Sequence, residues 1–150
     1  MILSGETIKD KCKGMITPYA SKGTVRGRSY GLSYAGYDIR IKQSLRLPPK
    51  GFSLASTIER FNMPNDVLAI VHDKSSWARV GLSVFNTVVE PGWEGWLTLE
   101  LINHSDKDLY ITEGDPIAQM VFHQIDKPVD GYKGKYQNQG DEPVEAKYEF

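Results

Sequence analysis

The stretch VVEPGWEGWLTLELIN, residues 88–103, joins a turn signal to a run of alternating side chains. The part EPGWEG contains the proline and glycine residues that interrupt regular structure. In WLTLELIN three leucines fall on one face of an extended chain, and Thr98 and Glu100 fall on the other. The stretch therefore predicts a hairpin turn followed by a strand that buries one face.

Similar short runs of β-forming residues occupy most of the chain after residue 37. They are DIRI, SLRL, FSLASTIE, VLAIVH, LSVFNTVVE, WLTLELIN, LYIT and IAQMVFHQI. Turn signals such as LPPKG, MPND and HSDKD separate them. About eight short strands at this spacing favour an all-β fold, namely a sandwich, a jelly roll or a distorted barrel.

The two ends of the chain differ from this pattern. The opening ILSGETIKDKCK, with Ser4 as a cap, predicts a short N-terminal helix. Residues 14–37 are rich in Gly, Ser, Tyr and Arg without periodicity, and they are interpreted as a loop. Residues 126–150 are polar and contain glycine, which is typical of a flexible tail and leaves room for a lid. We expect one domain over residues 1–150.

The composition limits the classes of function. The chain has 18 basic and 19 acidic residues and a formal net charge of -1, so it lacks the basic excess that favours nucleic-acid polymers or membrane surfaces. Cys12 is the single cysteine, which excludes an internal disulfide framework. No apolar run approaches the roughly 18 residues of a membrane span. The start lacks the apolar core of a signal peptide, so we expect a cytoplasmic protein.

The histidines argue against a zinc site. His72, His104 and His123 are scattered, and no CxxC or HxE spacing accompanies the single cysteine. Zinc-dependent nucleobase deaminases carry an HxE and a PCxxC signature, which is absent here.

The segment KSSWARVGL, residues 74–82, places two serines between two cations. Hydroxyl donors and positive charge at fixed positions are what a phosphate chain requires. The alternative is a capped helical turn at the surface.

Six segments, in this order, resemble the motifs of the dUTPase and dCTP deaminase superfamily. They are YAGYDIR (34–40), KSSWARVGL (74–82), VVEPGWEG (88–95), LTLELIN (97–103), EGDPIAQMVF (113–122) and GKYQNQG (134–140). The resemblance implies a distorted β jelly roll, a homotrimer with active sites between subunits, and a nucleoside triphosphate substrate bound with Mg²⁺. The metal would be held through the substrate phosphates, without dedicated protein ligands.

Within the superfamily, the resemblance favours a zinc-independent dCTP deaminase, which converts dCTP and water to dUTP and ammonia. Glu100 matches the glutamate that takes a proton from water and passes it to the ring nitrogen N3. Ser75 would help to hold the water and a phosphate, and Arg79 would bind phosphate beside it. The alternative for Glu100 is an ordinary outward-facing strand residue, which alternation alone would favour.

The resemblance also assigns substrate-binding residues. The tail lacks the phenylalanine and arginine of a dUTPase ending, and GKYQNQG is similar to a deaminase ending instead. The base edge is assigned to Asn86 and Thr87. The remaining candidates, for phosphate binding, hydrogen bonding or packing over the phosphates, are Lys74, Ser76, Gln119, Tyr132, Lys135, Tyr136 and Gln139. Glu90 occupies the place of the dUTPase catalytic aspartate, and ordering the hairpin is its favoured role. The alternatives are that it positions water for phosphate cleavage or is only a turn charge before Pro91.

Three departures from the deaminase pattern leave alternatives open. Lys74 stands where arginine is usual, Pro116 stands where arginine is common, and residues 83–90 are about two residues shorter than expected. The alternatives are a dUTPase, a bifunctional dCTP deaminase and dUTPase, a deaminase that prefers dCMP, and a non-catalytic nucleotide-binding module.

Some prominent residues are interpreted as structural. Asp38 and Arg40 are expected to support the site near a subunit interface. The tryptophans at 77, 93 and 96 are expected to be buried rather than to stack on nucleic acid. The basic cluster of Lys22, Arg26 and Arg28 either reaches a neighbouring subunit's phosphates or is a solvated loop.

Overall fold

The computed structural model describes residues 1–11 and 13–149, so Cys12 lies outside the described residues. The chain opens with helix α1 (Gly5–Lys11). Its cap is Ser4, whose Oγ accepts a hydrogen bond from the Thr7 amide at 3.2 Å and whose carbonyl accepts one from the Ile8 amide at 2.9 Å. The predicted N-terminal helix is confirmed. Neither helix of the described residues has the length and hydropathy to span a membrane.

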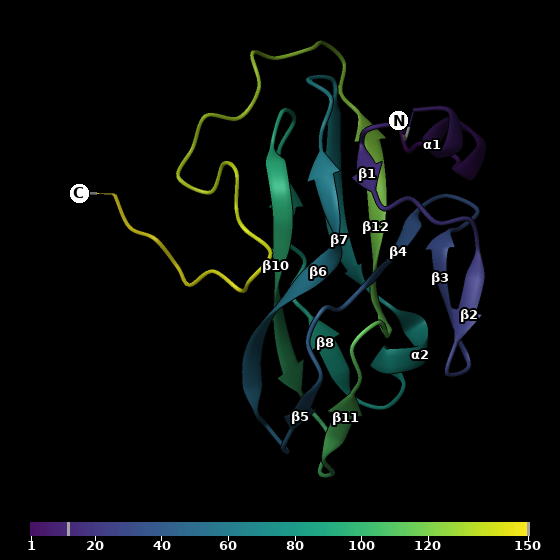
Figure 1. The fold of residues 1–150 in the computed structure, drawn as a ribbon, viewed down its shortest axis with the longest axis vertical. Coiled ribbons are helices and arrows are strands. Elements are labelled where there is room, and N and C mark those ends of the chain that lie inside the picture. The colour runs from purple at the N-terminus through teal and green to yellow at the C-terminus, as the bar shows by residue number, and fades with distance from the viewer. Residues whose placement is uncertain (12, 150) are drawn as a thin grey trace.

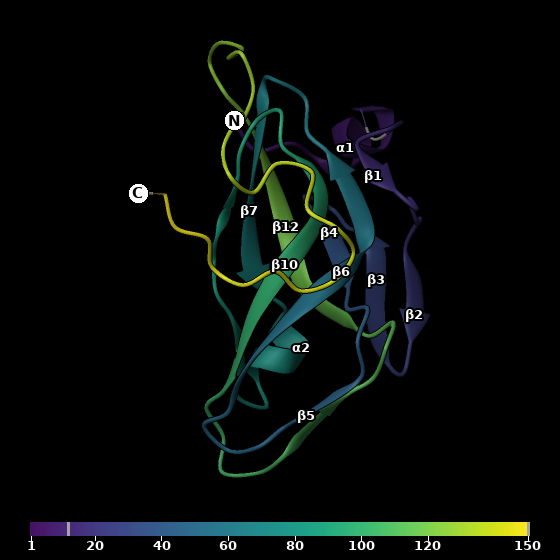
Figure 2. The same ribbon diagram turned by 60° about the vertical axis from the view of Figure 1, so that its left-hand side comes forward.

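Two antiparallel sheets face each other across the core (Figures 1 and 2). Among the described residues, one sheet has four strands in the order β1 (Ile16–Thr17), β6 (Phe52–Asn62), β10 (Glu94–Asn103) and β8 (Leu82–Val84). The other has six, in the order β2 (Gly23–Val25), β3 (Arg28–Leu32), β4 (Tyr37–Arg40), β12 (Pro116–Gln124), β7 (Val67–Asp73) and β9 (Val88–Val89). A small ribbon pairs β11 (Leu109–Ile111) with β5 (Leu45–Leu47).

Strand β10 has the two faces that its alternation predicts. Leu99 and Leu101 are buried in the core between the sheets, together with Phe61 of β6 and Phe122 of β12. Thr98 and Glu100 therefore lie on the opposite, outer face of the four-stranded sheet. The predicted all-β fold is confirmed, and the hydrophobic effect of one buried face per strand accounts for its layers.

The interpretation of residues 14–37 as a loop is wrong. This region forms β1 and the antiparallel hairpin of β2 and β3, which joins the six-stranded sheet. At the hairpin turn Arg26 and Gly27 both have positive φ angles, of 46° and 77°. Arginine is not a usual residue there, so the sequence carries only half of the turn signal. Arg26 is held in place by Asp115, whose Oδ1 lies 2.6 Å from its Nε.

The interpretation of LSVFNTVVE as one strand also needs correction. The segment divides into β8, which pairs with β10, and β9, which pairs with β7. The residues between them cross from one sheet to the other. One consequence is that Thr87 and Glu90 border the cavity on the outer face of β10, while Val89 is buried in the core.

The C-terminal segment runs back along β10, as Figure 2 shows. The amide of Asn138 donates to the carbonyl of Glu94 at 2.8 Å, and the amide of Trp96 donates to the carbonyl of Gln139 at 3.2 Å. Gly95 permits this approach: its φ is +143°, and a Cβ atom there would lie 2.7 Å from the Gln139 nitrogen. Further along, the amide of Val144 donates to Thr98 Oγ1 at 3.1 Å. The segment thus covers outward-facing side chains of β10.

Candidate active site

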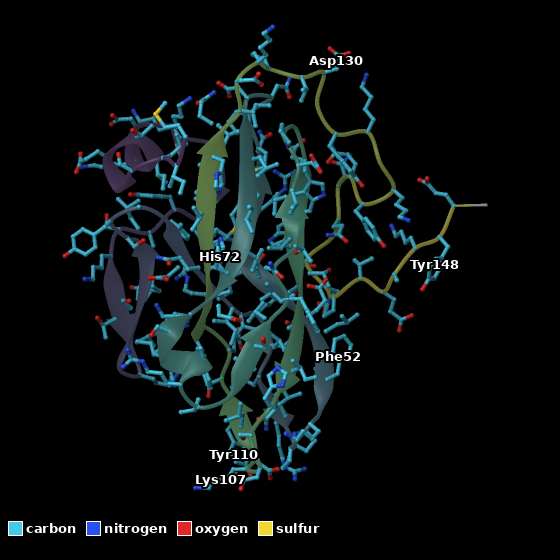
Figure 3. All side chains as sticks on the ribbon, turned by 180° about the vertical axis from the view of Figure 1, so that it is seen from behind. Phe52, His72, Lys107, Tyr110, Asp130 and Tyr148 are labelled. Carbon is cyan, nitrogen blue, oxygen red and sulfur yellow. The ribbon has the colours of Figure 1, made fainter. Side chains whose placement is uncertain are left out.

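A cavity of about 630 Å³ lies between the outer face of β10, the turn after β8 and the C-terminal segment. We call it the Glu100 cavity. Its lining consists of Phe52, Leu54, Thr87, Val88, Val89, Glu90, Trp93, Leu97, Thr98, Glu100, Tyr132, Tyr136, Gln139, Val144, Glu145 and Ala146. Figure 3 shows Phe52 on the same side of the molecule as the C-terminal segment that carries Tyr148. Most of these side chains are apolar, as is usual for a small-molecule site.

Glu100 is the carboxylate that β10 contributes to the cavity. In the register of the sheet it lies opposite Leu54 of β6. Burial raises the pKa of Glu100 above its ordinary value, because the apolar surroundings disfavour the charged form. No cation pairs with it among residues 1–11 and 13–149. A carboxyl group whose pKa is raised in this way is suited to accept and return a proton.

The turn between β9 and β10 supplies one wall. It is not the hairpin turn that the sequence predicted, because β9 pairs with β7 and β10 pairs with β6 and β8, so the turn joins the two sheets. Trp93 is buried, and its indole Nε1 donates to the carbonyl of Tyr136 at 2.7 Å. Thr87 and Glu90 line the cavity, while Asn86 is exposed and lines neither this cavity nor the cleft described below. Of the two residues assigned to the base edge, the structure therefore brings one, Thr87, to Glu100.

The C-terminal segment supplies the opposite wall. Tyr132, Tyr136 and Gln139 all line the cavity. The amide of Tyr136 donates to the Tyr132 hydroxyl at 3.1 Å, and Gln139 Nε2 donates to the Trp96 carbonyl at 3.3 Å. Lys135 is exposed and lies 5.5 Å from the centre of the Tyr136 ring, outside the lining.

The KSSWARVGL segment forms a second, chemically different region. Helix α2 (Ser75–Ala78) is a single turn, anchored by Trp77, which is 4% exposed and donates its indole N–H to the Pro116 carbonyl at 2.7 Å. Beside it lies an open cleft of about 520 Å³, which we call the cationic cleft. It is lined by Gly27, Arg28, Ser29, Lys74, Ser75, Ser76 and Arg79.

Lys74 is already engaged within this region. Its Nζ lies 3.1 Å from Asp38 Oδ1 and donates to Ser29 Oγ at 3.3 Å. Burial raises the pKa of Asp38 and the Lys74 ammonium opposes that rise. Gln119 lines an adjoining pocket with these residues, and its Nε2 donates to Ser33 Oγ at 2.9 Å.

The Glu100 cavity and the cationic cleft share no lining residue. In one chain, Ser75 and Arg79 are thus grouped with Lys74 and Ser76, whereas Glu100 is grouped with residues of the β9–β10 turn and the C-terminal segment. Among residues 1–11 and 13–149, no three His, Cys, Asp or Glu side chains gather as metal ligands.

Several lining residues were not anticipated. Phe52 and Leu54 belong to β6, and the sequence does not show which strands pair with each other. Val144 belongs to a segment without periodicity. The sequence therefore did not connect these residues to Glu100. The residues Arg28 and Ser29 come from the region interpreted as a loop. The basic cluster at 22–28 was a signal for Arg28, but it could not indicate which of its three cations enters the cleft.

Arg40 forms a structural ion pair within the chain. Its Nε lies 2.8 Å from Glu59 Oε1, and its amide donates to Glu59 Oε2 at 3.0 Å. Glu59 is fully buried, which raises its pKa, while Arg40 stabilises the charged form. This pair joins β4 to β6 and so ties the two sheets together.

Comparison with known proteins adds a family context. A family model described as dCTP deaminase-like matches residues 35–125. A dCTP deaminase of Acidobacterium capsulatum is 35% identical over 161 residues, covering 85% of this chain and 88% of the relative. A dCTP deaminase of Campylobacter hominis is 38% identical over 160 residues, covering 84% of each chain.

Solved structures with a similar fold include dUTPases. The native dUTPase of EIAV aligns with a TM-score of 0.60 at 18% identity, over 82% of this chain and 99% of that one. A point mutant of the dUTPase from phage phi11 of S. aureus, described with a structural Mg(II) ion, aligns with a TM-score of 0.59 at 17% identity, over 77% and 93%. At this identity the likeness shows the fold, a dUTPase-like jelly roll.

Proposed function

The chain belongs to the dCTP deaminase-like family, and on that premise we propose that it hydrolyses the exocyclic amine of a cytosine deoxynucleotide. The preferred reaction is dCTP and water to dUTP and ammonia, without zinc. The observation that carries the proposal is Glu100, a partly buried carboxyl group of raised pKa facing a largely apolar cavity. A binding module has no need for such a group, because burying a carboxylate costs stability.

Glu100 acts as the proton carrier. Its carboxylate takes a proton from water as the water oxygen bonds to C4, and it delivers that proton to N3. In the tetrahedral intermediate, Glu100 receives the proton of the new hydroxyl and passes it to the amine. The C4–N bond then breaks, ammonia leaves, and the C4 carbonyl of uracil forms. Every proton of the attacking water is thereby accounted for.

The base lies in the Glu100 cavity, with Thr87 at its edge and Tyr132 and Tyr136 over it. Gln139 fixes the C-terminal segment beside β10, and Lys135, which is exposed in the single chain, turns to the phosphates when substrate binds. We assign residues 126–150 the role of a lid that excludes water from the reacting carbon. Support comes from the hydrogen bonds that already join this segment to Trp93 and Trp96.

The phosphates lie in the cationic cleft, on Lys74, Ser75, Ser76 and Arg79. Because this cleft and the Glu100 cavity share no lining residue, we propose that a complete site joins the cavity of one subunit to the cleft of a second in a homotrimer. Ser75 of the second subunit then holds both a phosphate and the attacking water. Gln119 adds a hydrogen bond near Lys74.

Magnesium would arrive with the nucleotide. The cationic cleft combines cations with the hydroxyls of three serines, and these groups suit a phosphate chain. Mg²⁺ would bind the oxygens of that phosphate chain and of water, which are the ligands it prefers. When bound, the ion neutralises phosphate charge, and the residues of this chain act on the phosphates as described.

A second candidate activity is hydrolysis of dUTP, alone or after deamination. One specific observation favours it: Glu90, which directly follows β9, lines the same cavity as Glu100. A second carboxylate there has room to position water for attack on a phosphate.

Product analysis tests both activities. The purified protein is incubated with Mg²⁺ and, separately, dCTP, dCMP and dUTP, and the products are separated by chromatography while ammonia is assayed. We expect dUTP and ammonia from dCTP. Release of pyrophosphate that disappears in Glu90→Gln, with ammonia release retained, would establish the bifunctional enzyme. Absence of ammonia from every cytosine nucleotide would contradict the proposed function.

A further inference from the structure

The cationic cleft is also lined by Arg28, which lies far from the KSSWARVGL segment in the sequence. Arg28 comes from β3, 48 residues before Ser76 in the chain, yet it lies against Ser76 and Trp77. Its Nε donates to Ser76 Oγ at 3.2 Å, and its Cζ lies 3.8 Å from the centre of the Trp77 ring. The β2–β3 hairpin thus delivers a guanidinium to the turn that is assigned to phosphate binding.

The stacking on Trp77 fixes the plane of the Arg28 guanidinium. Trp77 is itself immobilised, since it is buried and hydrogen-bonded to the Pro116 carbonyl. A guanidinium stacked on an aromatic ring keeps its outer N–H groups available in the plane, in the fork that matches two phosphate oxygens. Arg28 is therefore oriented before any ligand binds.

The charge of Arg28 is also unpaired. In the part of the chain that the structure describes, no carboxylate lies within ion-pair distance of Arg28 or Arg79. Lys74 differs, because its ammonium is paired with Asp38 at 3.1 Å and its side chain is only 10% exposed. Of the three cations that line the cleft, the two guanidiniums are the ones free to meet an anion.

We propose that Arg28 is a phosphate-binding residue that selects a polyphosphate over a monophosphate. It supplies the bidentate fork that Lys74 does not, and it acts on an outer phosphate together with Arg79. A single phosphate group presents its oxygens to one guanidinium fork, whereas a triphosphate has several phosphate groups and can engage both guanidiniums. The inference rests on the proposed function for the identity of the nucleotide, but the phosphate preference is a property of the cleft itself.

Three variants separate this role from a structural one. Arg28→Met removes the fork and the charge, and Arg28→Lys keeps the charge without the fork. Arg46→Met is the matched control, since it removes the same charge from a surface pair with Asp108 that lines neither region. Thermal melting of all three establishes that they are folded.

The first readout is calorimetric binding of inorganic triphosphate and of inorganic phosphate, both with Mg²⁺, which does not depend on turnover. We expect Arg28→Met to weaken triphosphate binding about 10-fold or more, because it removes a charge-assisted contact. Arg28→Lys should recover part of that loss, and Arg46→Met should bind as the wild type does. Phosphate binding should change much less than triphosphate binding.

The second readout is the KM for ammonia release from dCTP and from dCMP. Arg28→Met should raise the KM for dCTP selectively and leave kcat nearly unchanged. Unchanged triphosphate binding in Arg28→Met, or equal losses for triphosphate and phosphate, would overturn the inference. If no cytosine nucleotide is deaminated by the wild type, the proposed function fails, and the calorimetric comparison still decides the role of Arg28.

Discussion

The Glu100 cavity and the cationic cleft differ in their electrostatics. In the cavity, one carboxyl group is surrounded by apolar side chains and has no cation beside it in the described residues, so burial raises its pKa. In the cleft, neighbouring side chains contact two of the three cations: Asp38 pairs with Lys74, and Ser76 and Trp77 contact Arg28. Proton transfer needs a group that changes its charge, whereas phosphate binding needs charges that stay fixed.

This contrast predicts that changes to Glu100 in the cavity affect kcat, whereas changes to the cations of the cleft affect KM. It also predicts that the cavity, and not the cleft, reduces the stability of the fold, because an unpaired buried carboxylate is unfavourable. The predictions that follow test this division, beginning with the largest effect.

The largest effect is expected for Glu100→Gln. Loss of the proton carrier should reduce kcat for ammonia release about 1,000-fold, within the range typical of general acid–base catalysis. Binding of inorganic triphosphate should not change, since Glu100 does not line the cleft. Steady-state kinetics and calorimetry measure the two quantities. Near-normal ammonia release from this variant would remove Glu100 from the chemistry.

In the cationic cleft, Arg79→Met should produce the opposite kinetic pattern. We expect the KM for dCTP to rise about 10- to 100-fold, the range for losing a charged hydrogen bond to phosphate, while kcat at saturation falls far less. Arg46→Met serves again as the control of equal charge. A large fall in kcat with unchanged KM would show that Arg79 takes part in the chemical step and does not act only on the phosphates.

One added methyl group, at Gly95, should weaken the attachment of the C-terminal segment to β10. Gly95→Ala places a methyl group 2.7 Å from the Gln139 nitrogen and forces alanine into a φ of +143°. The strain, about 1–3 kcal/mol, should loosen the segment and accelerate amide hydrogen exchange at residues 136–146. Gly140→Ala is the matched control, because a Cβ atom there meets nothing within 4 Å. Equal exchange in the two variants would refute a Gly95-dependent lid.

The smallest effect concerns stability and pH. The pKa of Glu100 is higher in the folded chain than its ordinary value of 4.5, so the folded state binds this proton more tightly than the unfolded state. Ionised Glu100 therefore destabilises the fold above its folded pKa, and the penalty disappears as the pH falls toward 4.5. Glu100→Gln should melt at a higher temperature than the wild type at about pH 7, with the difference shrinking at lower pH. A lower melting temperature at neutral pH would contradict the assigned cause of the shift.

Most of the fold could be predicted from the sequence, because a strand that buries one face alternates apolar and polar residues with a period of two. Alternation placed Glu100 on the outer face of β10 correctly, and Ser4 marked the start of α1. The hairpin of β2 and β3 was missed because its turn has Arg26 at a left-handed position, stabilised by Asp115, which is 89 residues away. A contact at that separation leaves no local signal.

The candidate site was readable only in part. Similarity to motifs grouped Glu100, Ser75 and Arg79, but it could not show that one chain separates them into two regions. The cavity wall formed by residues 137–146 depends on backbone hydrogen bonds and on Gly95. Neither leaves a periodic pattern in the sequence. Arg28 depends on a tertiary contact with Trp77 across two elements.

The most direct test of the account is complementation between subunits. Glu100→Gln and Arg79→Met chains are co-expressed, and the mixed oligomers are assayed with dCTP well below the KM of Arg79→Met. If the cavity of one copy works with the cleft of another, random mixing restores about one quarter of the wild-type sites, and ammonia release rises well above that of either variant. Activity no higher than the mean of the two variants would show that the two regions do not combine across subunits and would contradict the account.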